Sequence, residues 1–183
     1  MNTTDLRLES KIAEIRRLFD KSFAIAPVEK GIAPKAMLAI AIEGEPFALR
    51  VREISGLAVS NETIVPVPSR VPELLGLTGI RGVVVPVFSL PRLLGFDSLH
   101  SKTHWLVFCG EVQTPIALAF ETMERLFEAT DSKIFVRQEP VGHHPHVNAT
   151  VSEGATLRGV ISIPTLVEYI KTGAQLNGAK VRH

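Results

Sequence analysis

The first apolar pattern in the chain is that of an amphipathic helix. Apolar residues recur at intervals of three and four between positions 8 and 23, and charged residues fill most positions between them. This spacing places the apolar side chains on one helix face. Thr4 or Asp5 can cap the start, and the helix must end before Pro27, because a residue preceding proline is disfavoured in the α region. The apolar face consists of Leu8, Ile12, Ile15, Phe19 and Phe23.

This helix has two possible uses. Its apolar face can cover an open barrel edge or groove on the rest of the chain, or it can dock onto a partner protein. The segment 27–35, which contains Gly31 and Pro34, is typical of a linker. We therefore expect residues 1–36 to form a separate N-terminal unit of helix and linker.

From Met37 onward the pattern changes to short apolar segments separated by glycine and proline. The runs 37–42 and 47–51 flank the polar segment 43–46, which predicts a β-hairpin. Segment 64–67, with prolines at 66 and 68, is expected at a sheet edge. Many short strands favour barrels over a doubly wound sheet. Further strands are predicted at 83–88, 105–109, 115–120, 125–128, 134–136 and 156–163.

The stretch 75–95, LGLTGIRGVVVPVFSLPRLLG, contains the most informative turn. Gly79 and Gly82 bracket Ile80 and Arg81, so the backbone can adopt turn dihedrals while the Arg81 guanidinium projects outward. The β-branched run that follows predicts a strand. Ser89 and Pro91 then predict the start of a short helix that stops at Gly95.

A second copy of this strand-to-helix unit lies near the C-terminus. The segment 87–94, VFSLPRLL, aligns without gaps to the segment 160–167, VISIPTLV. In both copies a serine that can cap the helix is followed by a proline in its first turn. The match predicts two similar subdomains.

Composition narrows the class of protein. The chain has 183 residues, enough to bury a core without disulfides or metal. Its 20 basic and 19 acidic residues give a net charge of +1, and with one Trp and one Tyr it lacks the basic, aromatic-rich face of a nucleic-acid binder. The sole cysteine, Cys109, is expected to be a small buried hydrophobe, which fits a reducing cytoplasm. Neither a signal peptide nor an apolar run of about 18 residues indicates secretion or a membrane span.

One segment offers an enzymatic alternative. His143, His144 and His146, with Glu139 or Glu153, supply donor types that zinc accepts. Adjacent histidines on a proline-bearing loop rarely converge on one ion, and the sequence contains no HExxH or CxxC frame. A zinc-dependent hydrolase and a small-barrel nucleic-acid-binding protein therefore remain the weaker alternatives, and we expect no metal, no cofactor and no enzymatic activity.

The segment 47–95, with its FALRVREI strand, IVPVPSRVPELLGLTGIRG approach and RGVVVPVFSL exit, resembles the CheW family of chemotaxis coupling proteins. The likeness extends more loosely through residues 36–172. It implies a mainly β fold of two intertwined five-stranded Src-homology-3-like barrels with a C-terminal helix. A CheW-like domain is thus expected at 37–172, followed by a tail at 173–183.

The resemblance also implies a function and a site. Proteins of this family join the cytoplasmic tip of methyl-accepting chemotaxis receptors to the regulatory domain of the histidine kinase CheA, so we expect a scaffold recruited to receptor arrays, with no nucleic acid and no direct membrane insertion. One rim of the receptor groove is expected at Gly76, Arg81 and Gly82. The other is expected at Val51, Glu53 and Ile54, while kinase binding is expected in the second subdomain.

Three positions depart from the family pattern. Gly79 stands where the family usually has Asn, and Ser89 and Ser162 stand where an acidic residue usually caps the following helix. The serines preserve capping and remove negative charge. For Val51 and Ile54, core packing is an alternative to partner contact, and Glu53 is either a partner contact or a solvated carboxylate.

Overall fold

The computed structural model describes residues 33–60, 64–97, 104–111, 113–136 and 144–179. From Pro34 onward these residues lie within one compact unit, Pro34–His183. The predicted N-terminal helix over residues 8–23 and the candidate ligands Glu139 and His143 fall outside the described residues.

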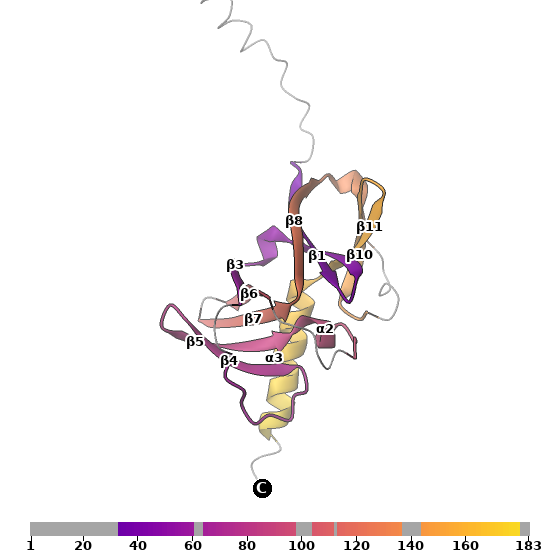
Figure 1. Ribbon diagram of the computed structural model, residues 1–183. Coiled ribbons are helices and arrows are strands. Elements are labelled where there is room, and N and C mark those ends of the chain that lie inside the picture. The colour runs from indigo at the N-terminus through magenta and orange to yellow at the C-terminus, as the bar shows by residue number, and fades with distance from the viewer. Residues whose placement is uncertain (1–32, 61–63, 98–103, 112, 137–143, 180–183) are drawn as a thin grey trace, which may run out of the picture. The chain divides into compact units, whose positions relative to one another are not determined.

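The first sheet contains six strands, drawn in the upper half of Figure 1. In its first hairpin, formed by β1 (Lys35–Ile42) and β2 (Glu45–Arg50), the second strand pairs in parallel with β11 (Thr156–Ile161), which comes near the end of the chain. The first and last strands of the described chain therefore build one sheet together. In spatial order the strands are β8 (Thr122–Ala129), β1 (Lys35–Ile42), β2 (Glu45–Arg50), β11 (Thr156–Ile161), β10 (Val147–Glu153) and β9 (Ile134–Val136).

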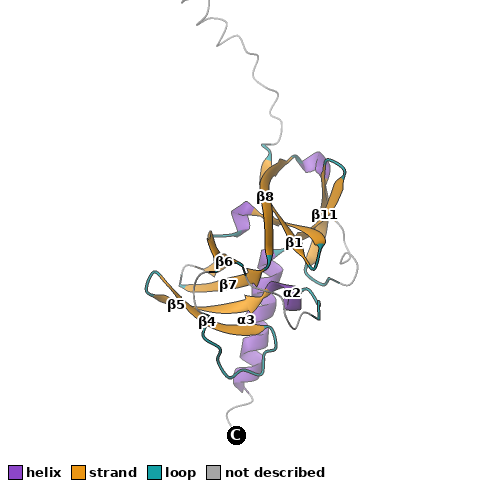
Figure 2. Cartoon of the chain, viewed as in Figure 1, coloured by secondary structure: helices purple, strands orange, loops and turns teal. Residues whose placement is uncertain are grey.

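The second sheet contains five strands from one continuous stretch of chain, drawn in the lower half of Figure 1. Within the described ranges four helical segments accompany the two sheets, and Figure 2 shows how few they are beside the strands. The strand order is β3 (Gly56–Val59), β6 (Trp105–Glu111), β7 (Thr114–Phe120), β5 (Val83–Ser89) and β4 (Leu74–Ile80). The helices are η1 (Val51–Glu53), α2 (Leu90–Leu93), η2 (Asp131–Lys133) and α3 (Ile163–Ala179).

Each sheet buries both of its faces. One face of each sheet, together with α2 and α3, packs into a shared apolar core that includes Leu38, Leu118 and Leu166. The other face encloses a small cluster of its own, around Val160 in the first sheet and Val87 in the second. Two barrels sharing one core, as the family resemblance implies, are thus confirmed, with β9 as a sixth strand in the first.

Strands predicted from apolar runs are confirmed, and three strands, β3, β4 and β10, were missed, of which β3 has only four residues. β4 contains two glycines, and β10 contains asparagine and serine, so neither has a continuous apolar pattern. The strand predicted over 156–163 ends at Ile161, because Ile163 already begins α3. Segment 64–67 contributes a single bridge, from Val65 to Leu77.

The sequence repeat corresponds to a structural repeat. Val87 pairs with Ala117 across a parallel ladder, and Val160, its counterpart in the second copy, pairs with Ala48. The irregularities in the two hairpins also correspond, since β4 shifts register between Leu74 and Gly76, and β10 between Val147 and Ala149. The eight matching residues are therefore part of two hairpin-plus-helix units with the same pairing.

Candidate functional site

The turn at Arg81 and Gly82 is a two-residue hairpin loop. Ile80 pairs with Val83 on either side of it, and the φ angles are 50° at Arg81 and 80° at Gly82. Positive φ at both central positions is the signature of a type I′ turn, which favours Asn, Asp or Gly and disfavours a long side chain such as arginine. Arg81 thus occupies a position where local conformation alone would select another residue.

The Arg81 side chain is exposed, as the sequence predicts. Among the described residues it forms no hydrogen bond or ion pair, so no intramolecular contact accounts for its presence. Next to it, Val83 and Val84 are exposed by 49% and 66%. The sequence predicts only a strand here, because a run of three valines carries no sign that its first two members face solvent.

Gly76 has a structural task within β4. Its φ is 152°, and a Cβ atom added there would overlap the carbonyl oxygen of Val65. The segment around Val65 crosses β4 at this point through the bridge to Leu77. Only glycine permits so close an approach of two backbones. Gly76 therefore supports the strand that carries Arg81.

Val51, Glu53 and Ile54 lie on or beside the 3₁₀ turn η1, which links β2 of the first sheet to β3 of the second. Val51 and Ile54 are partly buried and pack against the shared core. The turn closes through a hydrogen bond from the Ile54 amide to the Val51 carbonyl. Regular strand alternation therefore does not apply here, and core packing accounts for both apolar residues.

Glu53 is more enclosed than a solvated carboxylate, with its side chain 13% exposed. Its Oε1 lies 3.3 Å from Arg50 Nη1, and its Oε2 accepts a hydrogen bond of 3.3 Å from the amide of Ile163. An open groove of about 470 Å³ lies beside it, lined by η1, Gly110 and the first half of α3.

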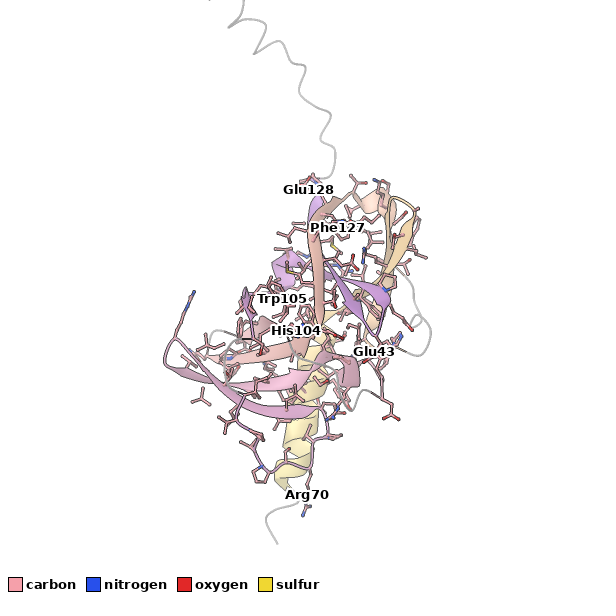
Figure 3. The ribbon with its side chains drawn as sticks, in the orientation of Figure 1. Glu43, Arg70, His104, Trp105, Phe127 and Glu128 are labelled. Carbon is pink, nitrogen blue, oxygen red and sulfur yellow. The ribbon has the colours of Figure 1, made fainter. Side chains whose placement is uncertain are left out.

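The six predicted residues thus fall into two groups, one on the β4–β5 hairpin and one at η1. In the described part of the chain, no hydrogen bond or ion pair joins Arg81 to Glu53, and Arg81 does not line the groove beside Glu53. A second cavity of about 410 Å³ lies elsewhere, between the loop containing Arg70, which Figure 3 labels, and the middle of α3.

The described histidines of the alternative zinc cluster have separate surroundings. His144 stacks on Phe96 and its Nδ1 lies 2.7 Å from the carbonyl oxygen of Leu94, whereas His146 is buried against Tyr169. The described residues contain no group of three metal-ligating side chains. His144 therefore has a packing role, joining the loop after α2 to the first barrel.

Cys109 is buried in the shared core, as predicted. Burial raises the pKa of its thiol to about 12, so the thiol remains protonated at neutral pH. A protonated, enclosed thiol is a poor nucleophile, and its environment fits a packing role.

The described residues thus form two barrels around one core, with an exposed arginine on a hairpin tip. A family model described as CheW-like domain matches residues 36–168, most of the chain. The chain therefore belongs to the CheW-like family, and it is a scaffold protein of chemotactic signal transduction.

One solved structure with the same fold is the scaffolding protein TtCheW from Thermoanaerobacter tengcongensis. The two chains share 14% sequence identity with a TM-score of 0.63, and the match covers 70% of this chain and 89% of that one. No curated protein matches the sequence. In the described residues, no helix is both long and apolar enough to cross a membrane.

Proposed function

We propose that this protein is a non-enzymatic adaptor that joins the cytoplasmic tip of methyl-accepting chemotaxis receptors to the regulatory domain of a CheA-type histidine kinase. The observation that carries the proposal is Arg81, an exposed arginine at φ 50° with no partner among the described residues. A residue kept in an unfavourable conformation without an internal contact is most simply retained for an external one.

The receptor surface of this proposal is centred on the β4–β5 hairpin. Arg81 offers a guanidinium, which binds carboxylates through paired hydrogen bonds, while Val83 and Val84 offer apolar area beside it. Gly82 sets the turn, and Gly76 holds its strand in place. Together these groups suit the end of a helical hairpin that presents both acidic and apolar side chains.

The second rim of the receptor surface is assigned to the turn η1, whose position is fixed by the core packing of Val51 and Ile54 and by the internal contacts of Glu53. The kinase regulatory domain would bind a different surface, so that one adaptor holds both partners at once. Joining them raises the effective concentration of kinase at the receptor and lets the receptor's state reach it. The protein would act in the cytoplasm, at membrane receptor arrays, through these partners alone.

Substitution of Arg81 tests the proposal. Arg81→Asn keeps a residue that the turn favours, so the melting temperature should stay the same or rise, while affinity for a receptor tip fragment should fall by about tenfold or more. Arg81→Glu should weaken receptor binding further. Binding to the kinase regulatory domain should not change, as measured by titration calorimetry on the same preparations.

A matched control is available in the first hairpin. Glu43 also has φ 50° and is followed by Gly44 at φ 81°, so Glu43→Asn alters a turn of the same kind on another hairpin. It should leave receptor affinity unchanged. Unchanged affinity in Arg81→Asn and Arg81→Glu would contradict the assignment of Arg81, and absence of receptor and kinase binding by the native protein would contradict the adaptor function itself.

A further inference from the structure

Both oxygens of the Glu53 carboxylate are occupied within the molecule. Oε1 faces Arg50, on the strand just before η1, and Oε2 accepts the amide hydrogen of Ile163, far along the chain. The side chain is only 13% exposed, so little of this carboxylate is accessible to a partner protein. Its contacts therefore indicate an intramolecular task.

The second contact is made at the start of α3. Ile163 is the first residue of this helix, where backbone amides have no acceptor within the helix, and Pro164 has no amide hydrogen to offer. A negative charge beside a helix N-terminus is stabilising because the exposed amides there carry partial positive charge. Glu53 thus satisfies the first amide of α3 from a distant part of the chain.

The equivalent helix in the second barrel is capped in a different way. In α2, the Ser89 hydroxyl accepts a hydrogen bond from the Arg92 amide, as in an ordinary N-cap. Ser162 is its counterpart before α3, but its backbone carbonyl, not its hydroxyl, accepts the bonds from Thr165 and Leu166. Of the two helices that follow the repeated strands, only α3 receives a side chain from η1.

We propose that Glu53 is a positioning residue: it ties η1 to the N-terminus of α3 and thereby fixes Val51 and Ile54, instead of offering its charge to a partner. The consequence for binding rests on the proposed function of η1 as a receptor rim, whereas the tie itself does not. Because coupling between two sites is reciprocal, a partner that orders η1 must also order the first turn of α3.

Three variants of the full chain test this role. Glu53→Ala removes the acceptor, Glu53→Gln keeps an amide oxygen for Ile163 while removing the charge, and Glu168→Ala removes an exposed carboxylate that lines the same groove. Hydrogen exchange of the Ile163 amide is measured by NMR, and affinity for a receptor tip fragment is measured by calorimetry.

With Glu53→Ala, exchange at Ile163 should accelerate by about fivefold or more, the size expected when one hydrogen bond is lost, and receptor affinity should fall with it. Glu53→Gln should keep the exchange rate at Ile163 and the receptor affinity close to their native values, and Glu168→Ala should change neither quantity. If Glu53→Ala is too unstable to study, comparison of Glu53→Gln with the native chain still tests the proposal. A Glu53 that only ties η1 to α3 predicts near-native exchange at Ile163 and near-native receptor affinity in Glu53→Gln.

Two outcomes would overturn the tie. One is native exchange at Ile163 in Glu53→Ala, and the other is loss of receptor affinity in Glu53→Gln at native exchange, which would make Glu53 a charged partner contact. If the native protein binds no receptor fragment, the adaptor proposal fails, but the exchange measurements still confirm or reject the tie.

Discussion

At one equivalent position, the interior of the second barrel contains an apolar residue and that of the first a charged one. In the second barrel this position is Val85, which packs in an apolar cluster; in the first it is Arg158, which is only 3% exposed. Arg158 donates to Glu153 at 2.7 Å and to Glu124 at 2.6 Å, so it joins β11 to β10 and β8. At this position one repeat thus closes by apolar packing, and the other by buried ion pairs, which we call the ionic clamp.

The charges of this clamp stabilise one another. Burial opposes ionisation of Arg158, yet hydrogen bonds to Glu124 and Glu153 outweigh it and raise the pKa of the guanidinium. Burial likewise disfavours the Glu153 carboxylate, but Arg158 and Arg125 hold its pKa below the usual value. The same repeated backbone can therefore be closed by apolar packing in one barrel and by buried ion pairs in the other.

Removing Arg158 should have the largest effect on stability. Arg158→Met leaves Glu153 and Glu124 without their buried partner, and should cost about 3 kcal/mol in urea unfolding. Val85→Ala in the second barrel should cost about 2 kcal/mol, from lost burial and a small cavity. A variant that also carries Glu124→Gln and Glu153→Gln should recover part of the loss. A smaller cost for Arg158→Met than for Val85→Ala would contradict the clamp.

The clamp also predicts an acid dependence. Because the folded state lowers the pKa of Glu153, this residue contributes stability above its unfolded value near 4.5, and the contribution disappears as pH falls through the lower folded value. The unfolding free energy of the native chain should therefore decline below about pH 4.5. In Glu153→Gln this part of the decline should be absent.

The strand bulges give a second matched pair. Gly76 and its counterpart Ala149 stand at corresponding register shifts, but a Cβ atom at Gly76 would overlap the carbonyl oxygen of Val65, whereas Ala149 already carries one. Gly76→Ala should cost about 2 to 3 kcal/mol through overlap and strain, whereas Ala149→Gly should cost about 1 kcal/mol. Equal costs in thermal unfolding would show that the close approach at Val65 is unimportant.

The helix caps give a third pair with a smaller effect. Ser89→Ala removes the acceptor for the Arg92 amide and should cost about 0.5 to 1 kcal/mol. Ser162→Ala should cost less, because the Ser162 hydroxyl makes no hydrogen bond to the described residues of α3. The ranking is checked by chemical unfolding of both variants, and the reverse ranking would refute it.

The smallest effect is expected at His146, whose counterpart in the second barrel is Glu73. The backbone carbonyl of His146 accepts a hydrogen bond from the Ser162 amide, as that of Glu73 does from the Ser89 amide. Burial lowers the pKa of His146, so the unfolded state binds a proton first and stability should fall slightly as pH drops below about 6.5. His146→Gln should flatten that part of the profile, and an unchanged profile would contradict the assignment.

Sequence patterns predicted the barrels better than the site. Apolar runs such as 105–109 and 115–120 indicated the correct strands because burial is recorded in residue type. The sequence predicted that Ser89 and Ser162 cap their helices in the same way. The eight-residue match contains no sign that Glu53 supplies the acceptor for the first amide of α3. Long-range contacts of this kind depend on tertiary packing, which local spacing does not encode.

Some features of the turn at Arg81 could be predicted from the sequence, and others could not. The turn at Gly82 and the exposure of the Arg81 side chain were predicted from neighbouring residues alone, because a type I′ turn is a local structure. The absence of a hydrogen bond or ion pair between Arg81 and Glu53 in the described residues was not, since such contacts depend on tertiary packing. The rim residues therefore stay predictions until binding is measured.

The pairing of the β1–β2 hairpin with β11 has a consequence for synthesis on the ribosome. Every strand of the second sheet lies between residues 56 and 120, so this sheet can assemble while the chain is still growing. The first sheet has to wait for its latest strands, leaving the early hairpin with an open apolar face until then. That interval is when the nascent protein is most exposed to aggregation.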